Sequence, residues 1–323
     1  MKRICVLVVA CLLASAGRIA LAGPYPDRPI RVIVPYLAGG NADITARVIA
    51  QKMSISMKVP VVVENKPGAN GMIGTDYVVK AAPDGYTLLL DASGPLVVNP
   101  SLYKSVPYDP LTDLAPVSQI TSYQYALVVR HGSPIHSVDE LVALARAKPG
   151  ELTYGSAGVG SGGHLAGALL GVMTHTQLTH VPYKGNAQAL TDTLSGQLSF
   201  DFDTIATSAP HIAAGRLRAF AVSGPQRSSA LPNLPTMDEL GYKGFNVTQF
   251  QGLLAPARTP PDVIARLHKE VVEAARQPDV VKKLADEGGN EIVAGTPEAF
   301  AALLRSDLAR FRTLLRQANV NLE

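Results

Sequence analysis

The sequence has few cysteines and no tryptophan, and its two cysteines stand close to the first residue. Cys5 and Cys11 both lie within residues 1–22 of a chain of 323 residues. If that segment is removed on export, the remaining chain has no cysteine, which excludes a disulfide, a thiol nucleophile and a thiolate metal site. The seven histidines show no spacing typical of a metal site, so we predict neither a metal nor a cofactor.

Residues 1–22 have the pattern of a secretory signal peptide. Lys2 and Arg3 form a positive start, residues 4–16 are apolar or small, and Ala20-Leu21-Ala22 offers a small-residue cleavage site. We therefore predict an exported protein that is cleaved after Ala22. A membrane anchor fits less well, because the apolar run is shorter than the roughly 20 residues of a spanning helix. A lipoprotein signal ending at Cys11 remains a minor alternative, with a very short apolar stretch before it.

The mature chain also lacks an excess of charge and a long apolar run. The signal segment carries Lys2, Arg3 and Arg18 and no acid, so 26 of the 29 basic residues remain to face 26 acidic ones. A neutral balance without a basic stripe does not favour nucleic acid or an anionic membrane as partner. We expect a mature protein that is not embedded in a membrane and does not bind nucleic acid.

What the chain does contain is an alternation of short β-rich runs with helical periodicity. This alternation predicts an α/β fold with parallel sheets covered by helices. The expected strands cover residues 30–34, 59–63, 87–90, 126–129, 152–154, 178–181, 198–202 and 217–222. Beyond about Pro260 only helical patterns follow, so this part must bury its apolar faces on a sheet made earlier.

About 300 mature residues suffice for two lobes, since single hydrophobic cores stop growing near that size. The economical arrangement returns the C-terminal helices to the first lobe, with crossings near Ser118–Gln124 and Asn246–Gly252. We predict one lobe from residues 23–121 plus 249–323, a second from residues 122–248, and a monomer.

The loop from Pro35 to Asp43 joins the first strand to the first helix and contains a glycine pair. Gly39 and Gly40 let the backbone approach a ligand closely, and Asn41 could cap the helix. Ligands of open α/β sheets bind beyond the carboxyl ends of strands, where free N–H groups and the helix dipole favour an anion. A plain capped turn would have the same residues.

A second loop, Gly155 to His164, repeats the arrangement with five glycines and two serines. So many flexible residues cost folding entropy, which a bare connection would not require. Its weak G-x-G-x-x-G match lacks the acid expected about 20 residues further on, which argues against a dinucleotide site. Facing the first loop across a cleft, it would complete an anion site.

Further candidates follow other strands. Ser93 ends the third strand region and could line the cleft, and Tyr183 could present a hydroxyl or a ring face to a ligand. Lys184 could supply a cation, although a solvated or structural lysine is the slightly favoured interpretation. Asp201 and Asp203 are better suited to capping or to holding the lobes together than to acid–base catalysis. No serine stands in a G-x-S-x-G setting, so enzyme signatures are lacking.

At these loops the sequence resembles the Bug family, the extracytoplasmic receptors of tripartite tricarboxylate transporters. The matching segments run in order along nearly the whole chain: Tyr25–Ile30, Pro35–Asp43, Val61–Ala69, Ala82–Leu88, Asn99–Tyr103, Tyr154–Gly158, His180–Gly185 and Gly252–Pro256. The resemblance implies a type II periplasmic-binding-protein fold, with two α/β lobes around a ligand cleft, and a periplasmic location.

The resemblance also implies ligands and site residues. Family members bind di- and tricarboxylates, acidic amino acids or aromatic carboxylates. Carried over by position, the ligand-binding residues are Tyr36, Gly39, Gly40, Asn41, Asp43, Ser156, Ala157, Ser161, Gly162, Tyr183, Lys184 and Asp203. The sequence departs from the family at Leu37, Ala38 and Asn41, and it has Phe250 and Gln251 where a tryptophan is common. These departures concern the shape of the cleft and the choice of ligand.

The function that follows from the resemblance is transport, not catalysis. A small carboxylate would close the lobes, and the closed form would dock on the permease subunits of a tripartite tricarboxylate transporter. Two alternatives stay open, a periplasmic ligand sensor for a membrane signalling protein and a secreted α/β hydrolase-type enzyme.

Overall fold

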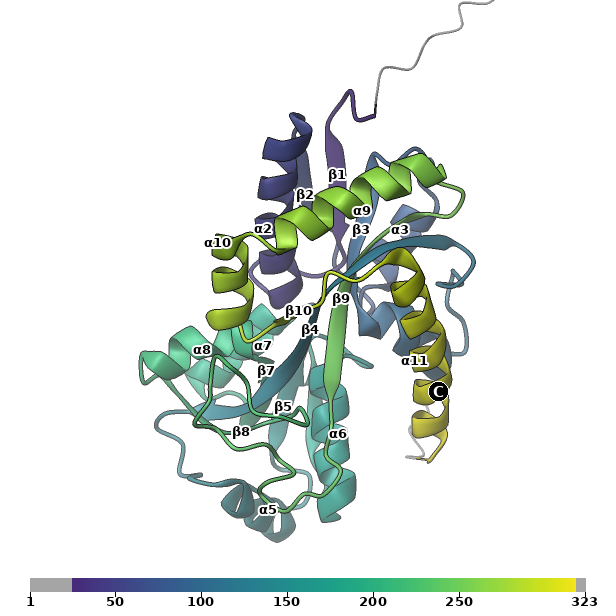
Figure 1. The fold of residues 1–323 in the computed structure, drawn as a ribbon. Coiled ribbons are helices and arrows are strands. Elements are labelled where there is room, and N and C mark those ends of the chain that lie inside the picture. Colours follow the sequence, from purple (N-terminus) through teal and green to yellow (C-terminus); the bar gives the residue numbers. More distant parts are fainter. Residues whose placement is uncertain (1–24, 318–323) are drawn as a thin grey trace, which may run out of the picture.

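The computed structural model describes residues 25–317, and the predicted signal peptide lies outside the described residues. Ten strands are ordered β2-β1-β3-β9-β4-β7-β5-β6, with β8 and β10 also paired to β4. Figure 1 shows an upper part built from both ends of the chain and a lower part built from its middle. The helices cover the faces of the sheets, as expected for an α/β protein with parallel strands.

The upper lobe contains three parallel strands, with β1 between β2 and β3. Their bounds, with those of the connecting helices, are β1 Ile30–Val34, α2 Asn41–Met57, β2 Val61–Asn65, α3 Met72–Val79 and β3 Thr87–Ala92. A π-helical turn, η1 (Gly94–Val98), and α4 (Asn99–Leu102) follow β3. The second strand starts two residues later than the sequence predicts, since Val59 follows the left-handed Lys58 that ends α2.

The lower lobe repeats the alternation. Strand β5 pairs parallel to both β6 and β7. The bounds are α5 Val138–Ala147, β5 Thr153–Ser156, α6 Gly162–Thr174, β6 Thr179–Pro182, α7 Asn186–Ser195, β7 Phe200–Thr204, α8 Ile205–Ala213 and β8 Leu217–Val222. Strands β7 and β8 both run antiparallel to the end of β4.

One long strand, β4 (Leu114–Arg130), passes through both lobes. Up to Gln124 it pairs with β9 (Thr248–Pro256), and from Tyr125 onward it pairs with β7 and β8. The sequence predicts a crossing segment and a separate strand at residues 126–129, so this prediction is wrong in its boundary. The reason is that Tyr123, Tyr125 and the alternate residues after them share one core without a break.

The C-terminal part adds one short strand that the sequence does not predict. It comprises α9 Pro261–Ala275, α10 Pro278–Val281, the π-helical η2 Lys282–Asp286, β10 Glu291–Ile292 and α11 Pro297–Gln317. Strand β10 pairs with β4, with Glu291 opposite Ser122. Two residues are too few to show a period, and the expectation of helices alone after Pro260 is therefore corrected.

The buried apolar side chains fall into separate clusters for the two lobes. The clusters of the upper lobe contain buried residues from 30–120 and 250–311, and α9 and α11 contribute Leu267 and Phe300 to them. The clusters of the lower lobe contain buried residues from 123–247. This separation supports the proposed lobe boundaries near 121 and 249. Within residues 25–317, no helix is both long enough and apolar enough to span a bilayer.

Candidate ligand-binding site

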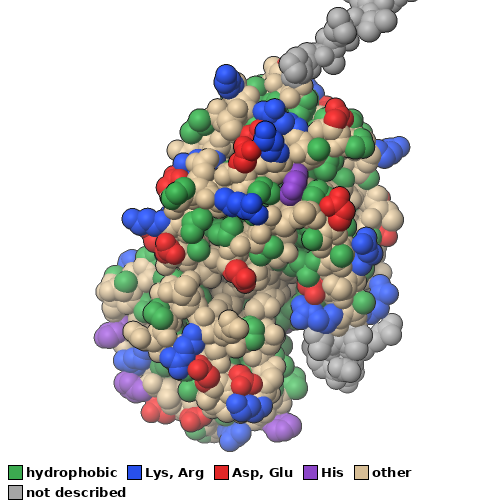
Figure 2. Space-filling view, in the orientation of Figure 1, with side chains coloured by type: hydrophobic (Ala, Val, Ile, Leu, Met, Phe, Trp, Pro, Cys, Tyr) green, Lys and Arg blue, Asp and Glu red, His purple; other side chains and the backbone are tan. Residues whose placement is uncertain are grey.

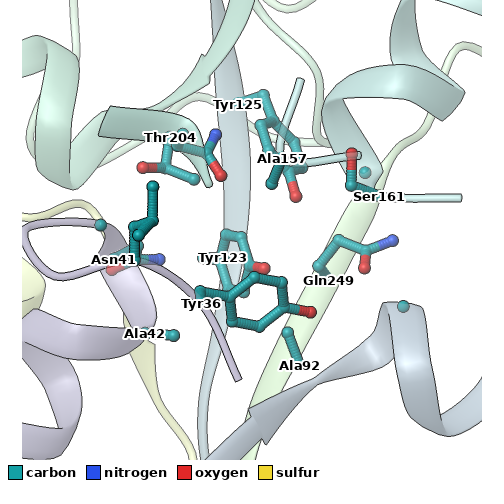
Figure 3. A pocket seen from close by; sticks show the side chains of 15 residues that line it. Tyr36, Asn41, Ala42, Ala92, Tyr123, Tyr125, Ala157, Ser161, Thr204 and Gln249 are labelled. Carbon is teal, nitrogen blue, oxygen red and sulfur yellow. The ribbon is translucent and has the colours of Figure 1, made fainter. Parts of the chain in front are cut away.

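A pocket of about 460 Å³, counted with its open mouth, lies where the two lobes meet. Its walls come from the β1–α2 and β5–α6 loops, from the ends of β3 and β7, from the start of α7, and from the crossing strands β4 and β9. Figure 3 shows Tyr36 and Tyr123 in its middle, with Asn41 and Thr204 on one side and Ser161 and Gln249 on the other. The pocket thus takes residues from both lobes.

Four helices begin at the pocket wall. Gly40 and Ser161 precede the first residues of α2 and α6, Asn186 is the first residue of α7, and Thr204 precedes α8. The first N–H groups of a helix have no partner within it, and the helix dipole adds about half a positive charge there. Helices from both lobes therefore direct partial positive charge at one cavity.

All the side chains that line the pocket are uncharged, so peptide groups must supply its electrostatic character. The lining residues are Tyr36, Leu37, Gly40, Asn41, Ala42, Ala92, Gly94, Tyr123, Tyr125, Ala157, Ser161, Gly162, Asn186, Thr204 and Gln249. On the outer surface, by contrast, side chains of both signs are mixed over the face seen in Figure 2. In the described part of the chain, no three histidine or acidic side chains are grouped as potential metal ligands.

The first glycine loop is held by Asp43 from within the helix that it precedes. Asp43 Oδ2 accepts hydrogen bonds from the Gly39 N–H (3.0 Å) and from Arg47 Nε (2.9 Å), and its Oδ1 accepts one from Asn65 (3.0 Å). Burial raises the pKa of Asp43, but the hydrogen bonds from Arg47, Gly39 and Asn65 outweigh it and leave this pKa below its usual value. Gly39 and Asp43 therefore shape the loop, and Gly40 lines the pocket.

Asn41 lies at the pocket but does not cap α2. The residue before the helix is Gly40, and the side-chain amides of Asn41 and Asn290 exchange two hydrogen bonds, of 3.1 and 3.2 Å. Asn290 comes from the C-terminal part of the chain, shortly before β10. The capping role that the sequence suggests is corrected, because this distant amide competes for the Asn41 side chain.

The second glycine loop is built around the start of α6. Ser161 Oγ accepts a hydrogen bond from the His164 N–H and thereby caps the helix. A side chain at Gly162 would place its Cβ 2.2 Å from the hydroxyl oxygen of Tyr125, so only glycine lets this phenol reach the helix start. Ala157, Ser161 and Gly162 all line the pocket, as the sequence predicts for the site.

Ser156 lies behind this loop and is occupied by it. Its hydroxyl contacts His180 Nε2 (2.6 Å) and donates to the Gly158 carbonyl (2.9 Å), while His164 accepts from the Gly160 N–H. Burial lowers the pKa of His164 to about 4. Burial and the neighbouring His164 lower the pKa of His180 to about 3, so both rings are neutral at pH 7. Ser156 thus fixes the loop conformation.

Four other predicted site residues, Ser93, Tyr183, Lys184 and Asp203, do not line the pocket. Ser93 Oγ accepts from the Phe250 N–H (3.0 Å), and Tyr183 donates to Asp192 (2.6 Å) beside a separate surface hollow. The Lys184 side chain is exposed, and its carbonyl accepts from the Leu37 N–H (3.4 Å) across the lobes. These contacts are structural, and a direct role with ligand for these side chains stays a prediction.

The two aspartates of β7 belong to the lower lobe alone. Asp203, a predicted site residue that does not line the pocket, accepts hydrogen bonds from Asn186 (3.2 Å) and Thr207 (2.6 Å). These hydrogen bonds stay within one lobe; of the two roles that the sequence suggests, capping or a tie between lobes, they do not support the tie. Burial, partly offset by these donors, raises the pKa of Asp203 to about 7, and burial together with Asp203 raises that of Asp201 well above its usual value.

A third buried acid, Asp91, lies beneath the pocket in the upper lobe. It accepts hydrogen bonds from Thr75 Oγ1 and from the Ala92 N–H, both 2.7 Å. Burial raises its pKa to about 7, although the donors oppose this shift. Burial, and next the charge of Asp91, raises the pKa of Tyr36, whose ring lines the pocket. The pocket is therefore flanked by buried carboxyl groups whose pKa values are raised above the usual range.

Sequence reasoning did not identify several lining residues. Tyr123 and Tyr125 project from β4, Gln249 projects from β9, and Asn186 and Thr204 stand at helix starts. The signal that could have found the first three is their place in the two predicted crossing segments or directly beside them. A chain that crosses between lobes must pass the cleft, so polar side chains there are ligand candidates.

Two α/β lobes that are joined by two crossing strands around a pocket of helix starts define a solute-binding protein with the type II periplasmic-binding-protein fold. The comparisons with known proteins agree with this class. A family model described as "Tripartite tricarboxylate transporter family receptor" matches residues 45–320. The chain belongs to this family of receptors, which is a family of binding proteins and not of enzymes, and the resemblance to the Bug proteins is confirmed.

Among its relatives is the protein BugT of Bordetella pertussis, which is 37% identical over 98% of both chains. The solved structure of the periplasmic binding protein BugD is 34% identical with a TM-score of 0.89, covering 93% of this chain and all of that one. A Rhodopseudomonas palustris protein solved with adipate is 33% identical with a TM-score of 0.88, covering 91% and 98%. The MatC protein of the same organism, solved with bound malate, is 30% identical with a TM-score of 0.86, covering 90% and 100%.

Proposed function

We propose that this protein is the periplasmic receptor that captures a small carboxylate for a tripartite tricarboxylate-type transporter. The observation that carries the proposal is the pocket wall, in which four helix starts meet and every side chain is uncharged. A carboxylate fits such a site, because oriented N–H groups compensate negative charge without a basic side chain. No acidic side chain lines the pocket to pair with a cationic ligand.

Structural neighbours support the ligand class. The neighbours solved with adipate and with malate hold small dicarboxylates, and both resemble this chain over at least 90% of its length. The precise acid differs between them, which agrees with a shared N–H cradle and variable side chains elsewhere in the pocket.

Closure of the lobes would convert ligand binding into a signal for the permease. The loops of the two lobes touch at the pocket mouth, where the Leu37 N–H lies 3.4 Å from the Lys184 carbonyl. A ligand that contacts both lobes binds the closed form better than the open one and shifts the population toward it. Permease subunits that recognise the closed form would then receive loaded receptors. We also propose that the receptor is a monomer.

One contact is compatible with the alternative of a hydrolase: Ser156 Oγ lies 2.6 Å from His180 Nε2, as in a nucleophile–base pair. Ser156 is fully buried, and its hydroxyl is engaged with the backbone of Gly158 on both the donor and the acceptor side. It is not part of the pocket wall. A nucleophile must reach the substrate, so this pair favours a structural role.

The test is a thermal-shift screen over aliphatic and aromatic carboxylates. Unfolding is monitored by circular dichroism, because the chain has no tryptophan to serve as a fluorescent probe. Ligand at 100 times its Kd adds about 2.7 kcal/mol to the free energy of unfolding. We expect Gly40→Val to abolish this shift, since a Cβ at Gly40 finds space beside Leu37 and the branched side chain would crowd the pocket.

The matched control is Gly132→Val, because a Cβ added at Gly132 would have no other atom within 4 Å and this residue is not part of the pocket lining. The variant should keep both the fold and the shift. A panel in which no carboxylate raises the melting temperature of the wild-type protein would refute the proposed function.

A further inference from the structure

The pocket has two ends with different chemistry. In Figure 3, Asn41 and Thr204 lie on one side of Tyr36 and Tyr123, and Ser161 and Gln249 lie on the other. The first side is formed by the starts of α2 and α8. The second side adds the hydroxyl of Ser161 and the carboxamide of Gln249 to the start of α6. An elongated ligand would therefore meet a different set of groups at each end.

Gln249 has an amide group that nothing in the described structure satisfies. The residue is 3% exposed, lies opposite Tyr123 in the β4–β9 pair, and lines the pocket. Its Nε2 is shielded from solvent and has no hydrogen-bond partner among residues 25–317. Leaving a buried donor unpaired costs free energy, so such groups in native proteins call for an explanation. The pocket is the space from which a partner can come.

The neighbouring groups at this end are also neutral donors. Ser161 Oγ already accepts from the His164 N–H, which leaves its hydroxyl hydrogen free to donate. Tyr125 brings a phenol against Gly162; burial, and further a hydrogen bond with Tyr123, raise the pKa of this phenol, so it keeps its proton. The Ser161 hydroxyl, the Tyr125 phenol and the Gln249 amide therefore suit an acceptor oxygen of the ligand. A ligand with an apolar tail at this end would leave these donors without a partner.

Resting on the proposed function, we propose that Gln249 is a specificity-determining residue that donates a hydrogen bond to the second end of the bound acid. It selects acids that carry an acceptor oxygen there, whether carboxylate, hydroxyl or carbonyl, over acids of equal length that end in a methyl group. In this proposal the helix starts bind the first carboxylate, and Gln249 donates to the opposite end of the ligand.

Gln251 provides a matched control on the same strand. Its Nε2 is likewise buried and without a partner in the described chain, but its Oε1 accepts from Thr121 Oγ1 (3.1 Å) and it does not line the pocket. A general effect of removing a buried carboxamide from β9 would appear at both positions. An effect on ligand choice should appear at Gln249 alone.

The experiment measures the Kd of adipate and hexanoate, and of succinate and butyrate, by calorimetry for the wild-type protein, Gln249→Met and Gln251→Met. We expect the wild type to prefer the diacid of each pair, and Gln249→Met to weaken diacid binding by about ten-fold or more, as for a bond to a charged acceptor. Binding of hexanoate and butyrate should change by less than about two-fold, since they make no such bond. Gln251→Met should leave the ratio within each pair unchanged.

If Gln249→Met does not fold, Gln249→Glu has the same shape without the amide donor and should lower the same ratio. An unchanged diacid preference in the Gln249 variants would overturn the inference, as would an equal loss for both members of each pair, and carboxylate capture itself would stand. Wild-type protein that binds hexanoate as tightly as adipate also overturns it. Failure of all carboxylates to bind would remove the proposed function and this inference together.

Discussion

Asp91 and Asp203 lead us to predict that binding at the neutral pocket depends on pH. Both are fully buried, and each accepts a hydrogen bond from a threonine. Asp91 also accepts one from the N–H of Ala92, and Asp203 accepts one from the side chain of Asn186; Ala92 and Asn186 both line the pocket. Burial raises the pKa of each to about 7, so we expect both to exchange protons near neutral pH. Next to Asp203, burial and then the charge of Asp203 raise the pKa of Asp201 well above its usual value.

Binding of an anion at this site should therefore take up protons. A negative ligand favours the protonated form of a nearby carboxyl group and raises its pKa further, so the affinity should increase as the pH falls from 8 toward 6. The uptake should fade well below pH 6, where both groups are already protonated in the free protein.

Calorimetry at pH 7 in buffers of different ionisation enthalpy measures this uptake. We expect an apparent binding enthalpy that varies with the buffer for wild-type protein, and less variation for Asp91→Asn and Asp203→Asn. The same enthalpy in every buffer would contradict the prediction.

At the level of elements, the starts of α2 and α6 differ in how tightly they are packed. An added Cβ at Gly40 would be 3.8 Å from its nearest neighbour, an ordinary contact, whereas at Gly162 it would overlap the ring and hydroxyl of Tyr125. Tyr125 is itself buried at 3% exposure, so it has little room to move away. The glycine of α6 is thus required by packing, whereas we propose that the glycine of α2 serves access to the ligand.

Alanine substitutions should separate the two cases. Gly162→Ala should lower the free energy of unfolding by about 1–3 kcal/mol, as overpacked buried sites do. Gly40→Ala should change it by less than about 0.5 kcal/mol, as at sites without such a conflict. Urea denaturation followed by far-ultraviolet circular dichroism gives both values, and equal losses at the two positions would show that our account of the α6 start is wrong.

At the level of the whole molecule, two strands connect the lobes and carry pocket residues. β4 changes partner from β9 to β7 between Gln124 and Tyr125, so the flexible point of a hinge would lie close to Tyr123 and Tyr125. Ligand contacts with these tyrosines would act directly on the hinge. At the mouth of the pocket, a Cβ at Gly185 would be 3.3 Å from Leu37 in the other lobe.

A bulky residue at Gly185 should therefore hold the lobes apart. Its φ of 165° is extended backbone that valine adopts, so Gly185→Val should fold normally and push against Leu37. We expect about ten-fold or more loss of carboxylate affinity, as when closure is penalised by about 1.4 kcal/mol or more. Small-angle scattering with ligand should show a larger radius of gyration than for Gly132→Val. Identical scattering and affinity in the two variants would mean that this contact does not govern closure.

The sequence alone was sufficient for the α/β class and the two glycine loops, and the export signal stays a prediction. Of the predicted site residues, the pocket wall contains Tyr36, Gly40, Asn41, Ala157, Ser161 and Gly162. These six residues could be predicted from the sequence because loop composition, helix starts and family motifs depend on residues that are adjacent in the sequence. The same local patterns did not separate Gly40, which lines the pocket, from Asp43, which holds the loop.

The three-dimensional arrangement was needed for the far end of the pocket. Gln249 stands beside Tyr123 only because β9 pairs with β4 in one register, and Asn41 leaves its helix cap only because Asn290 reaches it from near the other end of the chain. Periodicity reports whether a side chain is buried, but not what it is buried against. Pairing between distant segments sets those neighbours, and with them the ligand choice that we propose.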